Sequence, residues 1–326
     1  MSDRQQCAYL GPRGTFCEQA VAVLHGADEC EPVPYPTIAA AIDAVRTGSA
    51  QRAVVPIESS VEGGVNATLD ELSDDPPVLI RAEVIVPVEF ALLVRPGTAM
   101  ADIKVVGGHP VAQPQCRRWL AEHLPDAQWR PALSNADAAW QVADGELDAA
   151  LAGSFAARHY QLDVLVEGVH DRANAVTRFI ELGAPGPLPA PTAADRTSVI
   201  AYLTDDHPGA LMDILSQFAV RGVNLSRIES RPTGEGIGRY CFFIDCEGHV
   251  LAPSVGEALM GLRRACSDVR FLGSYAVAAA AGGPGGPARP GPATPRSRPT
   301  DAEPAPADGK FAAAAGWLDG IRAGRG

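Results

Sequence analysis

The segment RAVVPIESSVEGGVNATLDEL, residues 52–72, is the most informative stretch of this 326-residue chain. Its opening RAVVPI predicts a short buried strand that ends near Pro56, because proline cannot donate a hydrogen bond to a neighbouring strand. Polar residues and the pair Gly63-Gly64 follow, and an apolar rhythm resumes at Val65. We expect a strand, a turn and a helix start, where outward-pointing backbone N–H groups bind small anions. An ordinary strand-to-helix connection with hydroxyl caps is the alternative interpretation.

Strands and helices alternate on both sides of this segment, from CAYLG at 7–11 to AVTRFIELG at 175–183. Such alternation predicts an α/β domain over residues 6–184 with mostly parallel strands. The first helix is expected to begin at Thr15, which forms a capping-box pattern with Glu18.

A second domain is predicted after a proline-rich linker at 185–196. The pattern over 197–277 is strand, helix, strand, strand, helix, strand, which is the order of a ferredoxin-like unit. Residues 282–309 contain eight prolines and six glycines in 28 positions. Such a composition cannot form a core, so we expect the tail 278–326 to be disordered. Residues 311–322 fit a short amphipathic helix that either docks or frays, and we favour a frayed end.

The bulk composition excludes several classes of function. The formal net charge of −12 argues against a nucleic-acid partner, since the sequence has no basic run to neutralise phosphates. The N-terminus has no apolar signal region, and no apolar run approaches the roughly 20 residues that span a membrane. We therefore expect a cytoplasmic protein without a membrane partner.

The cysteines predict a reduced protein. There are seven, an odd number, and they are spread along the chain without a CxxC pair. Buried thiols are therefore expected rather than a disulfide framework. The sequence shows no metal-ligand spacing.

Three polar clusters lie at predicted strand ends of the first domain, where ligands bind in α/β sheets. They are GPRGTFCE at 11–18, PIESSVEGG at 56–64 and TRF at 177–179. Together they resemble the motifs of prephenate dehydratases, and GALMDILSQFAVRGVNLSRIESRP at 209–232 resembles the ACT regulatory domain of that family. The resemblance extends over about residues 6–277.

The motifs match with some departures. The family's PIEN motif is PIES here, with Ser59 in place of asparagine, and its SHPQ segment is GHPV at 108–111. A glutamine downstream of that segment is matched by Gln115, in a helix expected over about 113–124. The TRF motif is unchanged.

The resemblance implies a two-lobed catalytic domain like a type II periplasmic binding protein, followed by a βαββαβ ACT domain. It also implies conversion of prephenate to phenylpyruvate, carbon dioxide and water in L-phenylalanine biosynthesis, without a metal or organic cofactor. No chorismate mutase segment precedes the first motif, so a monofunctional dehydratase is expected. Arogenate as the substrate, and a non-catalytic amino-acid-sensing binding protein, are the alternatives.

The resemblance also assigns roles to the matched residues. Hydroxide is a poor leaving group, and Thr177 would stabilise it while a water or Glu58 delivers the proton. Arg178 would bind the pyruvyl carboxylate, which survives the reaction. Phe179 would give the carboxylate that leaves a less polar neighbour. The further substrate contacts are Pro12, Gly14, Thr15, Ser59, Ser60 and Gln115.

Each of these residues also has a purely structural interpretation. Thr177 fits a β-branched strand residue, Arg178 an ion-pair or surface residue, and Phe179 a core residue. Gln115 fits a helix surface. Glu62, beside the PIES motif, fits a solvated or capping charge.

The implied regulatory site lies between two ACT domains and binds phenylalanine, which would tighten a homodimer or homotetramer and lower activity. Its residues are Gly209, Ala210, Leu211, Asn224, Leu225, Glu229, Ser230, Arg231 and Pro232. An ordinary helix start followed by a turn is the structural alternative.

Overall fold

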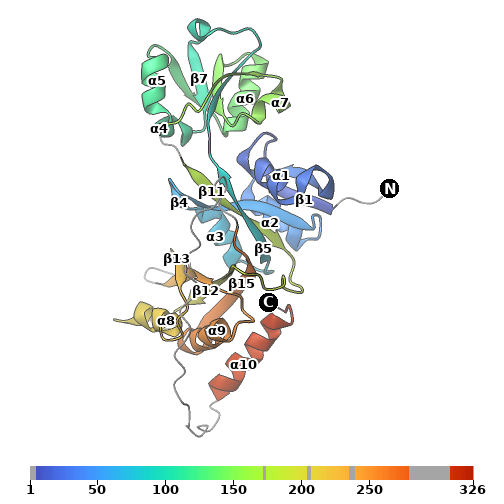
Figure 1. The fold of residues 1–326 in the computed structure, drawn as a ribbon, viewed down its shortest axis with the longest axis vertical. Coiled ribbons are helices and arrows are strands. Elements are labelled where there is room, and N and C mark those ends of the chain that lie inside the picture. Colours follow the sequence, from blue (N-terminus) through green and yellow to red (C-terminus); the bar gives the residue numbers. More distant parts are fainter. Residues whose placement is uncertain (1–4, 172–173, 204–206, 235–238, 279–308, 326) are drawn as a thin grey trace. The chain divides into compact units, whose positions relative to one another are not determined.

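The computed structural model describes residues 5–171, 174–203, 207–234, 239–278 and 309–325 (Figure 1). The chain divides between Ala184 and Pro185 into two compact units. The first unit contains two lobes, each with its own sheet, and the second contains one sheet.

The first lobe is built on a six-stranded sheet in the order β2-β1-β3-β11-β5, with the short β4 paired to β3. Its strands are β1 (Gln5–Leu10), β2 (Cys30–Tyr35), β3 (Arg52–Ser59), β4 (Gly63–Gly64), β5 (Leu79–Pro87) and β11 (Val176–Gly183). Its helices are α1 (Phe16–Glu29), α2 (Ile38–Arg46) and α3 (Asn66–Ser73).

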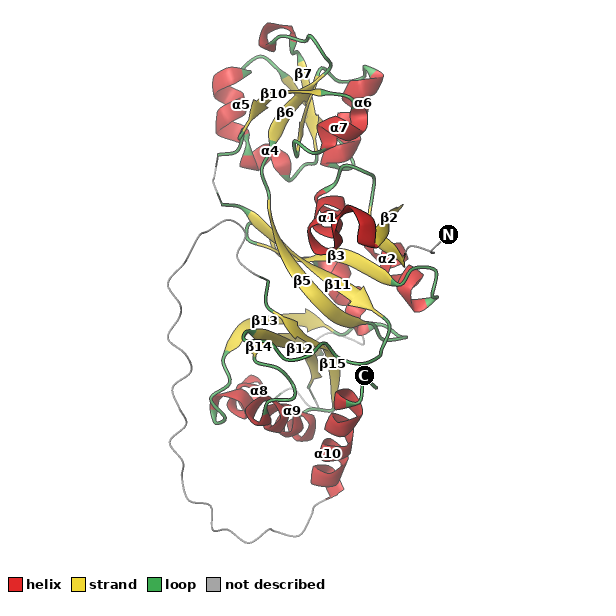
Figure 2. Cartoon of the chain, turned by 45° about the vertical axis from the view of Figure 1, so that its right-hand side comes forward, coloured by secondary structure: helices red, strands yellow, loops and turns green. Residues whose placement is uncertain are grey.

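The prediction of mostly parallel strands is wrong for this sheet. β1 runs parallel to β2 and β3, whereas β11 runs antiparallel to both β3 and β5. The reason is the two-lobed chain path, in which β5 leads out to the second lobe and β11 returns from it (Figure 2). The two crossing segments are joined where Val88 N–H donates to the Ala175 carbonyl at 2.8 Å.

The second lobe has a sheet in the order β10-β6-β9-β7-β8. Its strands are β6 (Ala91–Val94), β7 (Val105–Gly108), β8 (Gln128–Pro131), β9 (Ala149–Ala152) and β10 (Asp163–Glu167). Its helices are η1 (Met100–Asp102), α4 (Ala112–Gln115), α5 (Arg117–His123), α6 (Asn135–Asp144) and α7 (Ala156–Tyr160). The single helix expected over about 113–124 is split, because Cys116 adopts non-helical dihedrals between α4 and α5.

Helix α1 covers one face of the sheet of the first lobe. Cys17, Ala20 and Val21 of α1 pack in one core cluster with Tyr9 on β1 and Phe179 on β11. In the second lobe, one core cluster lies under α6 and α7 and another lies under α4 and α5. These helices flank the sheet on its two sides (Figure 1).

The second unit confirms the predicted βαββαβ order. It consists of β12 (Asp195–Tyr202), α8 (Ala210–Ala219), β13 (Leu225–Pro232), β14 (Tyr240–Glu247), α9 (Pro253–Ala265) and β15 (Asp268–Ala276). The strands form one antiparallel sheet in the order β13-β14-β12-β15. The last helix, α10 (Gly309–Arg322), follows.

The expectation of a frayed C-terminal end is wrong for α10. This helix packs against α9, and its Ala314, Leu318 and Ile321 side chains are buried. The guanidinium of Arg264 on α9 lies 4.3 Å from the ring centroid of Phe311. The apolar side chains spaced along residues 311–322 therefore form the face by which α10 docks on α9. The Pro/Gly-rich residues 279–308, predicted to be disordered, lie outside the described residues.

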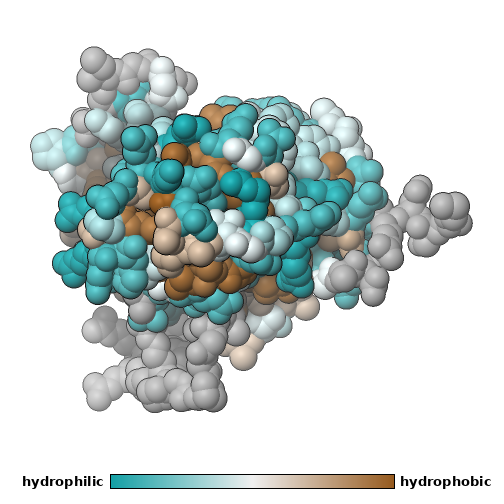
Figure 3. Space-filling view, turned by 90° about the horizontal axis from the view of Figure 1, so that it is seen from above, coloured by the Kyte–Doolittle hydropathy of each residue, from teal (hydrophilic) through white to brown (hydrophobic). Residues whose placement is uncertain are grey.

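All seven cysteines are buried and none forms a disulfide, which confirms the sequence prediction. Within the part of the chain that the structure describes, no helix is both long enough and apolar enough to cross a membrane. The face shown in Figure 3 mixes hydrophilic side chains with separate hydrophobic groups.

Candidate active site

The topology of the first lobe brings the three predicted motifs to one end of its sheet. β1 runs parallel to β3, so the loop after Leu10 follows the same strand end as Ser59. β11 is antiparallel to β3, and its first residues therefore also lie at this end. Thr177 pairs directly with Ser59, and Arg178 pairs with Glu58. Both crossings to the second lobe leave from the same end, next to Val88.

Thr177 is half-buried at the start of β11. Side chains alternate between the two faces of a strand, so Thr177 shares its face with Phe179, which packs under α1. The helix α1 begins just after β1 ends, at the same sheet end as Thr177. Thr177 therefore lies on the α1 face, at the end of the sheet where α1 begins.

The helix start expected at Ser59-Ser60 is wrong. β3 continues through Ser59, turns back into β4, and α3 begins only at Asn66. Gly63 has φ of +81°, a left-handed conformation that glycine tolerates and that suits a chain reversal. Pro56 lies inside the strand, next to a register shift opposite Arg178 and Phe179, which is a position where a sheet tolerates proline.

The hydroxyl groups of Ser59, which ends the PIES motif, and of Ser60 after it hold this hairpin and the neighbouring strand β11. Ser59 Oγ accepts from the backbone N–H groups of Val61 at 3.2 Å and Glu62 at 3.4 Å. The backbone N–H of Ser60 donates to the Val176 carbonyl at 2.9 Å, and Ser60 Oγ accepts from Val176 N–H at 3.0 Å. These bonds fix the end of β3 against the start of β11, immediately beside Thr177.

Arg178 faces the opposite side of the sheet from Thr177. Its Nη1 lies 3.3 Å from Glu58 Oε2, and its Nε lies 3.0 Å from Oε2 of Glu83, whose side chain is fully buried. Arg178 is itself only 7% exposed. The structure therefore supports the ion-pair interpretation of Arg178 over direct binding of a substrate carboxylate. Glu58 also lies on this face, so the predicted proton delivery from Glu58 to a leaving oxygen beside Thr177 is not supported.

Phe179 occupies the core rather than a substrate surface. It is 2% exposed and packs with Tyr9, Val84 and Val86 beneath α1. The core interpretation that the sequence left open is the one the structure supports.

The loop of residues 11–15, between β1 and α1, is held by contacts among its own residues and the first turn of α1. Thr15 is the N-cap of α1, and its hydroxyl accepts from Glu18 N–H at 3.4 Å and donates to the Leu10 carbonyl at 3.1 Å. Glu18 Oε2 accepts from Gly14 N–H at 2.5 Å, so this amide is engaged within the loop. The predicted capping pair is confirmed, with Glu18 bonded one residue earlier than the usual capping box. Pro12, which follows a cis peptide bond, is exposed.

Gly14 also marks where the two lobes touch. It has φ of +81°, and a Cβ at this position would lie 3.2 Å from the side chains of Ala156 and Tyr160 of α7. The hydroxyl of Tyr160 donates to the Arg13 carbonyl at 2.7 Å. Burial, followed by the charges of Glu18 and Asp137, raises the pKa of Tyr160, so its hydroxyl stays a donor at neutral pH.

Aromatic side chains that the sequence did not single out gather next to this loop. The ring of Phe16 makes edge contacts with Phe155 and Phe90 of the second lobe, at centroid distances of 5.3 Å and 6.1 Å. His159 Nε2 also lies 3.1 Å from Glu18 Oε2. A sequence signal existed for Phe155, because it follows Gly153-Ser154 at the end of a buried strand.

The GHPV segment at 108–111, which stands where the family has SHPQ, lies in the second lobe and is held by local contacts. Gly108 closes β7, and a Cβ there would lie 2.8 Å from the ring of Trp129, so a serine at this position would require that ring to move. His109 N–H donates to Asn135 Oδ1 at 2.8 Å. Gln115 is half-buried, and its Nε2 donates to the Val111 carbonyl at 3.0 Å within its own helix. This bond gives Gln115 a local structural partner.

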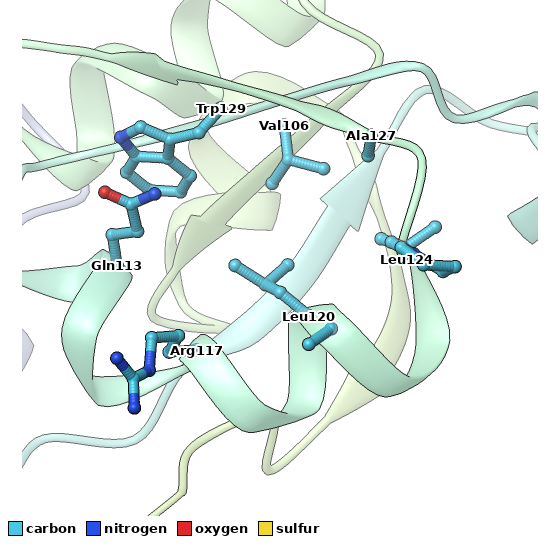
Figure 4. Close-up of a pocket in the computed structure, with 9 residues that line it drawn as sticks. Val106, Gln113, Arg117, Leu120, Leu124, Ala127 and Trp129 are labelled. Atoms are coloured by element: carbon cyan, nitrogen blue, oxygen red, sulfur yellow. The ribbon is translucent and has the colours of Figure 1, made fainter.

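A pocket of about 200 Å³ lies between α4, α5 and the sheet of the second lobe (Figure 4). Val106, Leu120 and Leu124 provide apolar walls, and the Gln113 carboxamide lies beside the Trp129 ring (Figure 4). None of its lining residues belongs to the predicted substrate site. The pocket is therefore a separate feature of the second lobe.

The predicted regulatory residues lie on two neighbouring parts of the second unit. Gly209 is the N-cap of α8, and Ala210 is buried while Leu211 is partly exposed. Leu225, Glu229, Ser230, Arg231 and Pro232 lie on β13, which is an edge strand of the sheet. Asn224 precedes this strand, and its Nδ2 donates to Glu247 Oε1 at 2.8 Å.

Comparison with known proteins places both units. The family model of prephenate dehydratase matches residues 7–186, and that of the ACT domain matches residues 197–264. A prephenate dehydratase of Mycobacterium marinum is 48% identical over 276 residues, which cover 82% of this chain and 87% of that protein.

Two solved structures resemble this chain over most of its length. The prephenate dehydratase of Arthrobacter aurescens, solved in complex with L-Phe, is 44% identical, with a TM-score of 0.79 and coverage of 97% of this chain and 99% of that one. GqqA, described as a novel type of quorum quenching acylase, is 29% identical, with a TM-score of 0.76 and coverage of 83% and 98%. The two family models and the relatives that match nearly end to end show that this chain belongs to the prephenate dehydratase family.

Proposed function

We propose that the chain converts prephenate to phenylpyruvate, carbon dioxide and water at the sheet end that carries Thr177, and that its ACT domain binds phenylalanine as an effector. The observation that supports this site best is the position of Thr177. It is half-buried, paired with Ser59, and on the face of the sheet covered by α1. Family membership supports the reaction, and the sheet topology supports this position for the site.

Loss of water is the step that requires Thr177. The C–O bond of the cyclohexadienol breaks while the ring carboxylate leaves as carbon dioxide, and the ring becomes aromatic. A threonine hydroxyl is too weak an acid to donate its proton outright, but it donates a hydrogen bond to the departing oxygen. Because Glu58 lies on the other face with Arg178, we propose that a water delivers the proton.

Binding of the surviving carboxylate is assigned to the start of α1. Unpaired backbone N–H groups and the helix macrodipole both favour an anion at a helix N-terminus. We propose that the amides that follow Thr15 bind the pyruvyl carboxylate. The edge-packed rings of Phe16 and Phe155 take over the apolar role expected of Phe179, since they lie next to this first turn. A less polar surface there lowers the free-energy barrier to loss of the ring carboxylate as carbon dioxide.

The direct test is a turnover assay with purified protein. Prephenate is supplied and phenylpyruvate is followed by its absorbance in alkali, with Thr177→Val compared against wild type. We expect a loss of about 10²–10³-fold in kcat for Thr177→Val, the usual effect of removing one donor to a developing oxyanion. Thr47→Val, at the end of α2 and away from this sheet end, is the matched control and should retain turnover. Full turnover by Thr177→Val would refute the role of Thr177.

The same assay separates the two candidate substrates. Arogenate differs from prephenate by an amine in place of the ketone, so a dehydratase that prefers it would form phenylalanine directly. A higher kcat/KM for arogenate than for prephenate would overturn the substrate assignment while leaving Thr177 in its role.

Phenylalanine binding is proposed for the edge strand β13 together with the start of α8. The A. aurescens relative was solved in complex with L-Phe, and Asn224 lies where β13 begins. Pairing of two ACT domains would enclose the amino acid and give a homodimer or homotetramer. Isothermal titration should show phenylalanine uptake by wild type and by Asn66→Ala, and weaker uptake by Asn224→Ala. Wild type with dehydratase activity but without uptake would contradict the proposal.

A further inference from the structure

Three potential metal ligands meet beneath the far end of α1. One ligand atom each from Cys7, His25 and Cys30 lies within 4.8 Å of the other two. Cys7 lies on β1 and Cys30 opens β2, while His25 comes from the last part of α1. In the register, Cys30 is opposite Gln5 and Cys7 is opposite Pro32. The two cysteines are thus diagonal neighbours on one face of the sheet.

A buried carboxylate stands beside this cluster. The side chain of Glu181 on β11 is 2% exposed, and its Oε1 lies 2.7 Å from Nη1 of Arg52. Its Oε2 contacts Nε2 of His25, whose side chain is 9% exposed. These two atoms are each other's partner, so the buried carboxylate lies directly against the imidazole of the cluster.

We propose that Cys7, Cys30 and His25 bind a thiophilic divalent cation of the zinc class, with Glu181 beside them. Two sulfurs and one imidazole nitrogen are three of the four ligands of a tetrahedral zinc site. Zinc binds sulfur at about 2.3 Å and imidazole nitrogen at about 2.0–2.1 Å. Ligand atoms within 4.8 Å of one another approach that geometry with small side-chain rotations. A carboxylate on a metal-ligating histidine commonly orients the ring and raises its basicity.

The cation would be structural rather than catalytic. Thr177 and Glu181 lie on one face of β11, four residues and therefore about 13 Å apart. The chain leaves helical geometry at Gly26, immediately after His25, and enters β2 at Cys30. A cation bound to both residues would clamp this connection and tie the end of α1 to β1. The other end of α1 carries Thr15, so the clamp would hold the helix that supports the substrate site.

The sequence could not show this site, because Cys7, His25 and Cys30 are separated by 17 and four residues and form no familiar metal motif. The inference does not depend on the proposed function, since the cation takes no part in the reaction. The alternatives are a protonated thiol pair beside a His25–Glu181 ion pair, and a disulfide between Cys7 and Cys30.

Spectroscopy with Co²⁺ on the full chain tests the proposal. Protein is purified under reducing, oxygen-free conditions, treated with chelator and titrated with Co²⁺. We expect a thiolate-to-cobalt charge-transfer band that saturates at one equivalent and disappears when Zn²⁺ is added. Cys30→Ala and His25→Gln should lose the band, whereas Cys116→Ala, a matched buried cysteine in the second lobe, should keep it. Glu181→Gln should weaken cobalt affinity by about 10–100-fold.

Two further measurements prevent a misfolded variant from deciding the outcome. Zn²⁺ added to chelator-treated wild type should raise its Tm, because a ligand of the native state alone stabilises that state. It should raise the Tm of Cys116→Ala equally and leave that of Cys30→Ala unchanged, with all proteins giving native circular dichroism. Absence of both the band and the Tm rise in folded wild type would overturn the proposal. A second result would also overturn the proposal. This is a Cys7–Cys30 disulfide that forms quantitatively in protein purified without reductant, together with no cobalt binding after that disulfide is reduced.

Discussion

Arg178 Nε lies 3.0 Å from Oε2 of Glu83, whose side chain has no exposed surface. This contact determines how the arginine of the TRF motif is interpreted. A guanidinium bonded to a buried carboxylate neutralises a charge that burial would otherwise penalise, and breaking such a pair from one side is costly.

Removal of Arg178 is therefore expected to affect stability more than substrate binding. Arg178→Met should lower the free energy of unfolding by about 3–5 kcal/mol, because Glu83 loses this buried partner. The double variant Arg178→Met/Glu83→Leu should recover much of that loss. Urea unfolding of the two variants measures both effects. If Arg178→Met retained full stability and only raised the KM for prephenate, Arg178 would be a substrate ligand after all.

Gly14 is expected to be intolerant of a side chain for two separable reasons. Gly14→Ala introduces a Cβ into a left-handed conformation, which costs about 1–2 kcal/mol, and places it 3.2 Å from Ala156 and Tyr160. Gly48→Ala is the control, because Gly48 has φ of +76° and no atom within 4 Å of the added Cβ. Thermal unfolding should show a larger Tm loss for Gly14→Ala, and equal losses would remove the lobe contact from the explanation.

Helix α10 is expected to undock when its apolar face is charged. Leu318 is 2% exposed, and full burial of a leucine side chain stabilises by about 1.5–3 kcal/mol. Leu318→Asp should therefore favour the undocked helix by at least about tenfold and expose residues 309–325 to limited proteolysis. Asp319→Asn, on the exposed face of the same helix, should leave the cleavage rate unchanged. Equal cleavage of the two variants would show that α10 does not depend on this packing.

Buried thiols should make the fold sensitive to alkaline pH. Burial, and secondarily the charge of Asp171, raises the pKa of Cys116 to about 12. A raised folded-state pKa means that the contribution to stability is complete below the unfolded-state pKa. That contribution is lost as the pH rises toward 12. The urea midpoint of wild type should fall between pH 8 and pH 10.5, and Cys116→Ala should show a smaller fall. An identical fall would exclude ionisation of Cys116 as a cause.

Local patterns in the sequence predicted the strand over RAVVPI, the capping pair Thr15 and Glu18, and the sheet end where Ser59 and Thr177 meet. These features depend on neighbours in sequence or on strand order, and both leave clear signals. The hairpin at Gly63 was missed because a glycine with positive φ and a helix-start glycine look the same in sequence.

Other features depend on register across distant strands. The contact of Arg178 with Glu83 requires the pairing of β11 with β5, nearly 100 residues apart, and so does the burial of Phe179. The apolar spacing of α10 was visible, but docking depends on the surface that α9 offers. The cluster of Cys7, His25 and Cys30 appears only when α1 is folded back over β1 and β2.

The most direct test of the proposed site is kcat for prephenate in Thr177→Ser and Thr177→Val, measured side by side with wild type. Serine keeps the hydroxyl and valine keeps the shape. We expect Thr177→Ser to retain most of the rate and Thr177→Val to lose about 10²–10³-fold, with similar unfolding temperatures. Equal rates in the two variants would contradict a hydroxyl on β11 acting on the departing oxygen.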